Sequence, residues 1–129
     1  MIIDSSALIA ILFNEREAVG FAQAMAGAET RAISAATVLE ATIVSEGRGG
    51  TAQEGRVDQL LREARAEIVP VTADQARIAQ EGWRRFGKGR HPAALNFGDC
   101  FAYALARERN QPLLFKGNDF TQTDVKAAI

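Results

Sequence analysis

Three aspartates stand at places where a folded chain could bring their carboxylates together. Asp4 follows the apolar run "MII", Asp99 stands near the start of the segment "NFGDCFAYALARE", and Asp119 comes shortly after the apolar run "PLLF". If these runs are parallel strands, their carboxyl ends share the edge of the sheet at which such folds build ligand sites. The spacing therefore predicts an acidic site at that edge.

A fourth acid, Glu40, lies in a segment with helical periodicity. At helical spacing its neighbours are Ala36, Ile43, Val44 and Gly47, and no cationic residue stands three or four positions away. This pattern predicts a buried and unpaired carboxylate. Such a group must be neutralised by protonation, by a cation from elsewhere in the fold or by a bound metal.

Each acid also has a simpler explanation when it is considered alone. Asp4 could cap a helix, Asp99 could interact with the positive end of its helix, and Asp119 could belong to a turn. Glu40 could pair with a distant arginine. Four carboxylates at one edge, however, repel one another unless multivalent cations lie among them.

The ligand types narrow the chemistry that such a site could perform. Carboxylate oxygens favour Mg²⁺ or Mn²⁺, and one histidine with one cysteine cannot complete a usual zinc site. A divalent ion held by acids can activate water and neutralise phosphate charge. Such a site could provide what hydrolysis of a phosphodiester requires.

The elements that must position these acids alternate along the chain. Strands are predicted at residues 1–3, 30–34, 67–71 and 111–115. Helices are predicted at 6–13, 17–27, 35–46, 51–66 and 74–87, followed by the helix that Asp99 opens. The order β-α-α-β-α-α-β-α-α-β implies a three-layer α/β/α fold with a mostly parallel sheet, in one domain over residues 1–129.

Composition limits the setting and the partners. The net charge of −1 gives no general attraction to nucleic acid, so a polyanion would need a local basic patch or metal ions. Cys100 is the only cysteine and cannot form an internal disulfide, which favours a cytoplasmic location. The first residues lack a basic leader region, and no apolar run is long enough to span a bilayer, so we expect no membrane association.

A basic segment at residues 83–91 is the candidate for contact with RNA. Its cationic residues are Arg84, Arg85, Lys88 and Arg90. Trp83 and Phe86 alternate with them, and aromatic rings can stack on unpaired bases. The alternative is that the cations form a solvated helix face while the two aromatic rings face the core.

Several other classes of enzyme fail on their motifs. A phosphatase of the haloacid-dehalogenase type needs D-x-D, and a DEDD exonuclease needs D-x-E, where this chain has Asp4, Ser5 and Ser6. A receiver domain needs adjacent acids after the first strand, and no P-loop motif is present.

The acidic motifs resemble those of a known family. "MIIDSSAL", the helix containing Glu40, "LNFGDCFAYALA" and "PLLFKGNDFTQTDV" are similar in order and spacing to the four motifs of PIN-domain ribonucleases, and specifically of VapC toxins from toxin-antitoxin pairs. The resemblance covers the whole chain and implies a PIN-like fold. It also implies a metal-dependent endoribonuclease that uses Mg²⁺ or Mn²⁺.

The resemblance assigns roles residue by residue. The metal-binding and catalytic acids would be Asp4, Glu40, Asp99 and Asp119, with Glu40 either ligating the ion or activating water. Ser6 would support a carboxylate, and Asn118 would support the site or form a turn. Asp124 is expected to be a solvated acid near the site.

The resemblance also implies partners. A VapC-like toxin is inhibited by a VapB-like antitoxin, forms homodimers and assembles with the antitoxin into hetero-oligomers. The apolar helices near the N-terminus could contact such a partner, or could only cover the sheet. The RNA target stays open, and the alternative to an enzyme is a catalytically silent PIN-fold interaction module.

Overall fold

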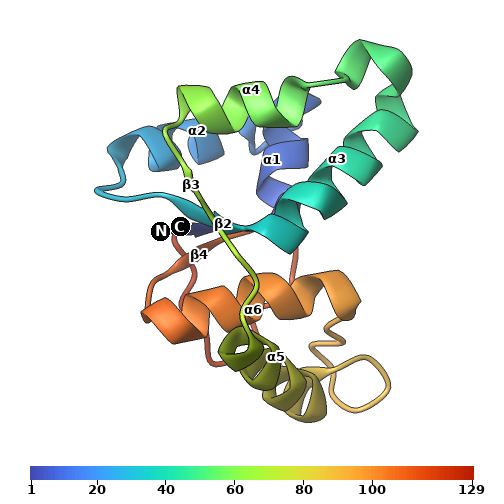
Figure 1. Cartoon of the computed structure of the whole chain (residues 1–129), viewed down its shortest axis with the longest axis vertical. Coiled ribbons are helices and arrows are strands. Elements are labelled where there is room, and N and C mark those ends of the chain that lie inside the picture. The colour runs from blue at the N-terminus through green and yellow to red at the C-terminus, as the bar shows by residue number, and fades with distance from the viewer.

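The computed structural model describes residues 1–129 and contains a four-stranded parallel sheet between two layers of helices (Figure 1). The strands are β1 (Ile2–Ile3), β2 (Ala32–Ser34), β3 (Glu67–Val69) and β4 (Leu113–Leu114). They lie in the order β3-β2-β1-β4, and all three pairings are parallel. The four predicted strands and the predicted parallel sheet are confirmed, although the strands predicted at 30–34, 67–71 and 111–115 are each shorter in the structure.

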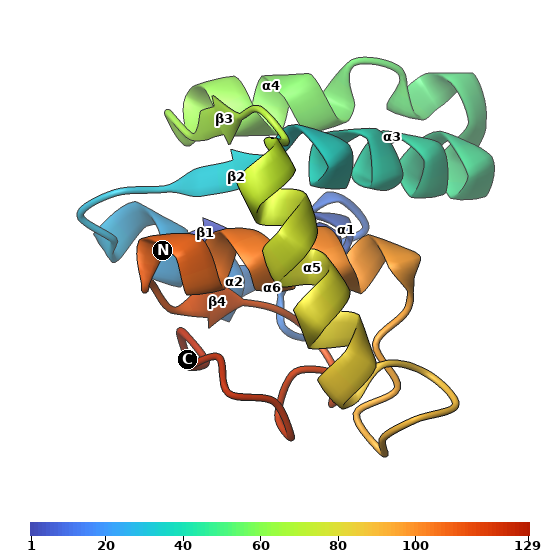
Figure 2. The same cartoon turned by 60° about the horizontal axis from the view of Figure 1, so that its bottom comes forward.

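Six α-helices connect and cover the strands. They are α1 (Ser5–Leu12), α2 (Ala18–Gly27), α3 (Ala35–Gly49), α4 (Arg56–Glu63), α5 (Ala73–Phe86) and α6 (Phe97–Arg109). Helices α1 to α4 lie on one side of the sheet, and α5 and α6 lie on the other, where they cross each other (Figures 1 and 2). The predicted three-layer α/β/α order is confirmed.

The side chains of the strands alternate between two separate cores. Ile2 and Leu113 pack with α5 and α6, whereas Ile3 and Leu114 pack with α1, α2 and α4. All four side chains are fully or almost fully buried. Because successive residues of a strand point to opposite faces, two-residue strands suffice to hold both helical layers on one sheet.

One predicted helix is divided in the structure. Residues 51–66 contain the end of a 3₁₀ turn at Gly50–Gln53 and then α4, which begins only at Arg56. Gly55 separates the two elements with φ of +76°, a backbone conformation that favours glycine. The helical periodicity of this segment therefore predicted the correct elements but not the break between them.

Asp124 is exposed to solvent, as expected, but its carboxylate is not free. The Tyr103 hydroxyl donates a 2.8 Å hydrogen bond to Asp124 Oδ1, and the guanidinium groups of Arg85 and Arg107 lie 3.0 and 3.6 Å from Oδ2. Burial, followed by this hydrogen bond, raises the pKa of Tyr103 to about 12. Asp124 thus fastens the C-terminal segment to α5 and α6.

The helices are all too short or too polar to cross a lipid bilayer.

Candidate active site

Asp4 lies directly after β1 and caps the next helix. Its Oδ2 accepts hydrogen bonds from the backbone N–H of Ser6 at 3.0 Å and from the Ser6 hydroxyl at 2.6 Å. The backbone N–H of Lys116, which follows β4, donates to the same hydroxyl at 2.9 Å. Ser6 therefore connects the Asp4 carboxylate to the neighbouring strand end.

The other oxygen of Asp4 has no partner. The residue is only 3% exposed, and Oδ1 is buried without any hydrogen bond. An unpaired buried carboxylate oxygen is destabilising unless a cation or a proton compensates it. Asp4 thus caps the helix with one oxygen, and its other oxygen is buried without a partner.

Asp99 enters the site from the first turn of α6. The helix begins at Phe97, two residues before Asp99, and is capped by reciprocal hydrogen bonds with Asn96. The Asn96 side chain accepts from the Asp99 N–H at 2.9 Å, and Asp99 Oδ2 accepts from the Asn96 N–H at 3.0 Å. The residues from Cys100 to Ala106 are buried, except for Phe101, and they anchor the helix in the core.

Glu40 was expected on a buried face of its helix, and this expectation is wrong. The buried residues of α3 are Thr37, Ala41 and Ser45, while Ile43 is 63% exposed. Helix α3 carries apolar residues on several sides, so periodicity alone did not identify the face that packs inward. Glu40 itself is half-buried.

Glu40 is nevertheless held close to the other acids. The Ser5 hydroxyl donates a 2.7 Å hydrogen bond to Glu40 Oε1, so the carboxylate is not unpaired. Ser5 is adjacent to Asp4, and the charge of Glu40 contributes to the raised pKa values of both Asp4 and Asp99. The contact of Ser5 was not predicted from the sequence, although the motif "DSS" contains two hydroxyl groups.

Asp119 lies at the periphery of this group. Its side chain is exposed, and it is near enough to Asp99 for its charge to raise the pKa of that carboxyl. The carbonyl of Asn118 accepts hydrogen bonds from the N–H and the hydroxyl of Thr121 at 3.2 and 2.8 Å. Asn118 therefore forms a turn in the structure.

The electrostatics of the site favour proton or cation uptake. Burial, with a smaller contribution from the charge of Glu40, raises the pKa of Asp4 to about 6 against the two Ser6 hydrogen bonds. Burial also raises the pKa of Asp99 to about 7, with added repulsion from the three other acids. These carboxylates are mutually destabilising when they are all ionised.

The carboxylate oxygens of the four acids are ligands of the type that divalent cations such as Mg²⁺ prefer. All four acids supply oxygen, and Asp4 Oδ1 is both buried and without a partner. As the side chains stand, no three Asp, Glu, His or Cys residues lie close enough together to surround one ion. Coordination by three or more of these acids therefore requires movement, and the exposed Asp119 is the acid freest to move.

Some residues of the basic segment 83–91 make contacts within the protein, whereas others are exposed and unpaired. Phe86 is buried, whereas Trp83 is 41% exposed and has the Arg90 guanidinium 4.3 Å from its ring centroid. Arg85 is paired with Asp124. Arg84 and Lys88 are exposed and form no ion pair in the structure.

An exposed apolar surface adjoins Glu40. A cavity of about 450 Å³ lies between α3 and α6. Its apolar lining includes Leu39, Ile43 and Val44 from α3 and Phe97 and Phe101 from α6. Phe97 is 82% exposed and packs edge-to-face against Phe101 at 5.0 Å. We refer to these five residues as the α3–α6 surface.

Comparison with protein families matches the PIN domain to residues 1–126. The chain is a PIN domain of the VapC family. It is 48% identical over 130 residues to Ribonuclease VapC28 of Mycobacterium tuberculosis, and the matched region covers 100% of this chain and 98% of the relative. It is also 50% identical over 127 residues to Ribonuclease VapC of Mycolicibacterium smegmatis, covering 98% of each chain.

Solved structures of low sequence identity share the PIN fold. A Mycobacterium tuberculosis toxin, VapC20, described as cleaving the sarcin-ricin loop, superposes with a TM-score of 0.78 at 16% identity, covering 96% of this chain and 95% of that one. A chain of a toxin-antitoxin complex from Klebsiella pneumoniae gives a TM-score of 0.74 at 21% identity, covering 99% and 97%. At these identities the likeness establishes the fold alone.

Proposed function

We propose that this PIN domain, spanning residues 1–129, is the metal-dependent endoribonuclease of a cytoplasmic toxin-antitoxin pair. The observation that carries the proposal is the cluster of Asp4, Asp99 and Glu40, in which a buried oxygen of Asp4 has no partner. Full-length relatives at 48% and 50% identity are named ribonucleases. The proposed metal is Mg²⁺ or Mn²⁺.

Four acids are proposed to hold the metal. Asp4 offers Oδ1 because its Oδ2 is engaged with Ser6, and Asp99 offers Oδ1 because its Oδ2 is engaged with Asn96. Asp119 joins them from its exposed turn. Glu40, held by Ser5, either completes the ligand set or accepts a proton from the attacking water.

A bound divalent ion would neutralise phosphate charge and lower the pKa of the nucleophilic water. The chain contributes the orientation of its carboxylates, which three local arrangements fix: the α1 cap, the α6 capping box and the Ser5 hydrogen bond. Arg84 and Lys88, which are free of ion pairs, are proposed to bind phosphates of the RNA, with Arg90 and the paired Arg85 beside them.

Purified protein incubated with structured and single-stranded RNAs tests this function. Cleavage is expected with Mg²⁺ or Mn²⁺ and is expected to disappear with EDTA, because the carboxylates alone cannot neutralise phosphate charge. Gel analysis of end-labelled RNA gives the cut positions. Failure of the folded, partner-free protein to cut any RNA, including sarcin-ricin loop and transfer RNA substrates, would favour the silent interaction module.

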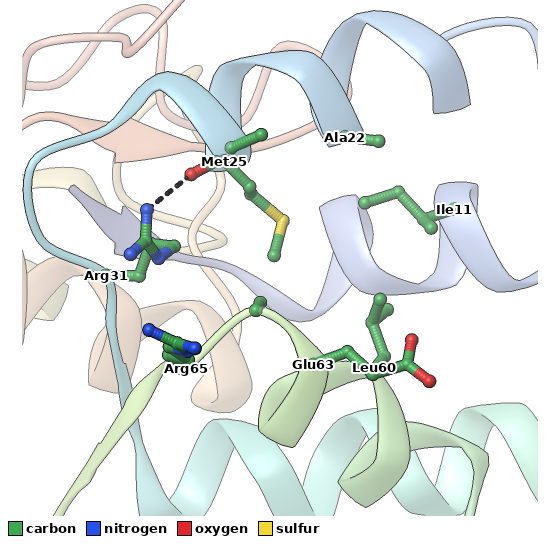
Figure 3. A pocket seen from close by; sticks show the side chains of 9 residues that line it. Ile11, Ala22, Met25, Arg31, Leu60, Glu63 and Arg65 are labelled. Atoms are coloured by element: carbon green, nitrogen blue, oxygen red, sulfur yellow. Dashed lines mark hydrogen bonds between the residues drawn. The ribbon is translucent and has the colours of Figure 1, made fainter.

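An antitoxin is the proposed partner. A cavity of about 340 Å³ lies between α1, α2 and α4, with an apolar lining that includes Ile11, Met25 and Leu60 (Figure 3). Arg31 and Arg65 lie together at one end of it (Figure 3). This pocket suits apolar side chains of a VapB-like antitoxin. If the antitoxin chain extends from the pocket to the four acids, it would block RNA from reaching them and so inhibit cleavage.

A homodimer is proposed to cover the α3–α6 surface. The surface is apolar, exposed and adjacent to Glu40, so a second copy would bury it and bring two acidic sites near each other. Ile43→Glu is expected to convert the dimer to a monomer in light-scattering measurements. The matched control is Val19→Glu, because Val19 is 66% exposed on α2 and lies outside this surface; equal dissociation by both variants would contradict the assignment.

A further inference from the structure

The carboxylate of Glu40 occupies space that a side chain at Gly98 would fill. A Cβ atom built on Gly98 would overlap Glu40 Oε2, and it would lie 2.5 Å from Cδ and 3.0 Å from Oε1. Gly98 is the second residue of α6 and directly precedes Asp99. Helix α3 therefore places a carboxylate directly against the backbone of the first turn of α6.

Backbone geometry does not explain a glycine at this position. The glycines with positive φ are Gly50, Gly55, Gly89 and Gly117, so Gly98 adopts a conformation open to any residue. Glycine is also among the least favourable residues within a helix. What the position requires is the absence of a side chain, because glycine permits close approach to the backbone.

The second oxygen of Glu40 is fixed from another element. Ser5, at the start of α1, donates its hydroxyl to Oε1 at 2.7 Å. Ser5 adjoins Asp4 in the sequence, and Gly98 adjoins Asp99. The Glu40 carboxylate thus lies between Ser5, which follows Asp4, and Gly98, which precedes Asp99. Ser5 donates a hydrogen bond to it, and Gly98 leaves the space that it occupies.

We propose that Gly98 is a positioning residue, whose missing side chain admits the Glu40 carboxylate to the metal site beside Asp4 and Asp99. The inference rests on the proposed function in treating this cluster as a metal site. It goes beyond that function because it assigns a specific requirement to a residue that carries no functional group.

A purely structural role for Gly98 makes a different prediction. If Gly98 only allowed α3 and α6 to pack closely, its substitution would lower stability whatever residue stood at position 40. If it acts through Glu40, the effect of Gly98→Ala on metal affinity disappears once the Glu40 carboxylate has been removed. A double-mutant cycle between Gly98→Ala and Glu40→Ala separates the two roles.

The experiment measures Mn²⁺ affinity by calorimetry and RNA cleavage for the four proteins of this cycle. Gly98→Ala is expected to weaken Mn²⁺ binding about 10-fold or more and to lower kcat more than it changes KM. In the Glu40→Ala background the same substitution is expected to change the affinity less than about 2-fold. The matched control is Gly47→Ala on α3, where a Cβ meets no atom within 4 Å, and it is expected to bind Mn²⁺ like the unsubstituted protein.

Two results would overturn the assignment. One is a Gly98→Ala variant that binds Mn²⁺ and cleaves RNA like the unsubstituted protein. The other is a loss of affinity that persists in the Glu40→Ala background, because it would show that Gly98 acts on something other than Glu40.

A metal-free crystal structure of Gly98→Ala separates this proposal from the proposed function. Displacement of the Glu40 carboxylate, with loss of its hydrogen bond to Ser5, supports the positioning role, and an unmoved carboxylate contradicts it. If the unsubstituted protein neither binds Mn²⁺ nor cleaves RNA, the proposed function fails. The crystal structure then still decides whether Gly98 positions Glu40.

Discussion

Asp99→Asn is expected to lower metal-dependent RNA cleavage by about 100-fold or more while the protein remains folded. The substitution removes a negative charge from the proposed metal site. It leaves an oxygen that can still accept the hydrogen bond from the Asn96 N–H at the start of α6. The capping box is therefore preserved, and the loss of activity reports on the charge rather than on the helix.

The matched control for this variant is Asp58→Asn. Asp58 is also an acid in the first turn of its helix, but it is exposed on α4 and makes no ion pair. The Asp58→Asn variant should cleave RNA at the same initial rate as the unsubstituted protein, measured with saturating Mg²⁺ or Mn²⁺. Full cleavage by a folded Asp99→Asn variant would contradict the assigned metal site.

The metal-free protein is expected to be more stable at pH 5 than at pH 8, by about 2 kcal/mol or more. Burial raises the pKa of Asp4 to about 6 and that of Asp99 to about 7, above the values near 4 that both have in an unfolded chain. The folded state therefore binds protons more tightly than the unfolded state. The stabilisation is complete below pH 4 and is lost as the pH rises through 6 and 7.

Divalent metal should reverse this pH dependence. Ionised carboxylates bind the ion, so Mg²⁺ or Mn²⁺ stabilises the folded protein at pH 8, by about 2.7 kcal/mol at a concentration 100 times the Kd. At pH 5 the protons compete with the ion and the gain is smaller. Urea unfolding with EDTA and with metal, at both pH values, measures the two effects.

Asp99→Asn provides the control for the pH experiment. Removing this carboxyl should raise the stability of the metal-free protein at pH 8 and flatten its dependence on pH, because one of the two titrating groups and its repulsion are gone. A metal-free protein that is less stable at pH 5 than at pH 8 would contradict the assigned electrostatics.

The order of the elements could be predicted because the apolar patterns of this chain are strong. The runs "MII" and "PLLF" contain the buried strands β1 and β4, and their parallel pairing brings Asp4 to the edge of the sheet that also receives Asp99. The break at Gly55 could not be predicted from periodicity, because the segments on both sides of it are helical. The sequence shows that position 55 is a glycine, but only the folded backbone shows that its φ is positive.

The proximity of the candidate acids was predictable from the sequence, but their surroundings were not. Glu40 lies near Asp4 and Asp99, as predicted, but its helix presents Ile43 and Val44 to solvent instead of burying them. Which side of α3 packs inward depends on its neighbours in the fold, and these lie far away in sequence. The contact of Glu40 with Gly98 could not be predicted for the same reason, because the two residues are far apart in sequence and no local pattern connects them.

The attachment of Asp124 to α5 and α6 affects how Asp119 can reach a metal ion. The segment that contains Asp119 begins at β4 and is fastened at its other end by Tyr103 and the two arginines that hold Asp124. A short segment with both ends fixed has little conformational entropy left to lose when one of its side chains moves inward. Recruiting Asp119 should therefore be a local adjustment rather than coupled folding, and calorimetry of metal binding should show only a small change in heat capacity.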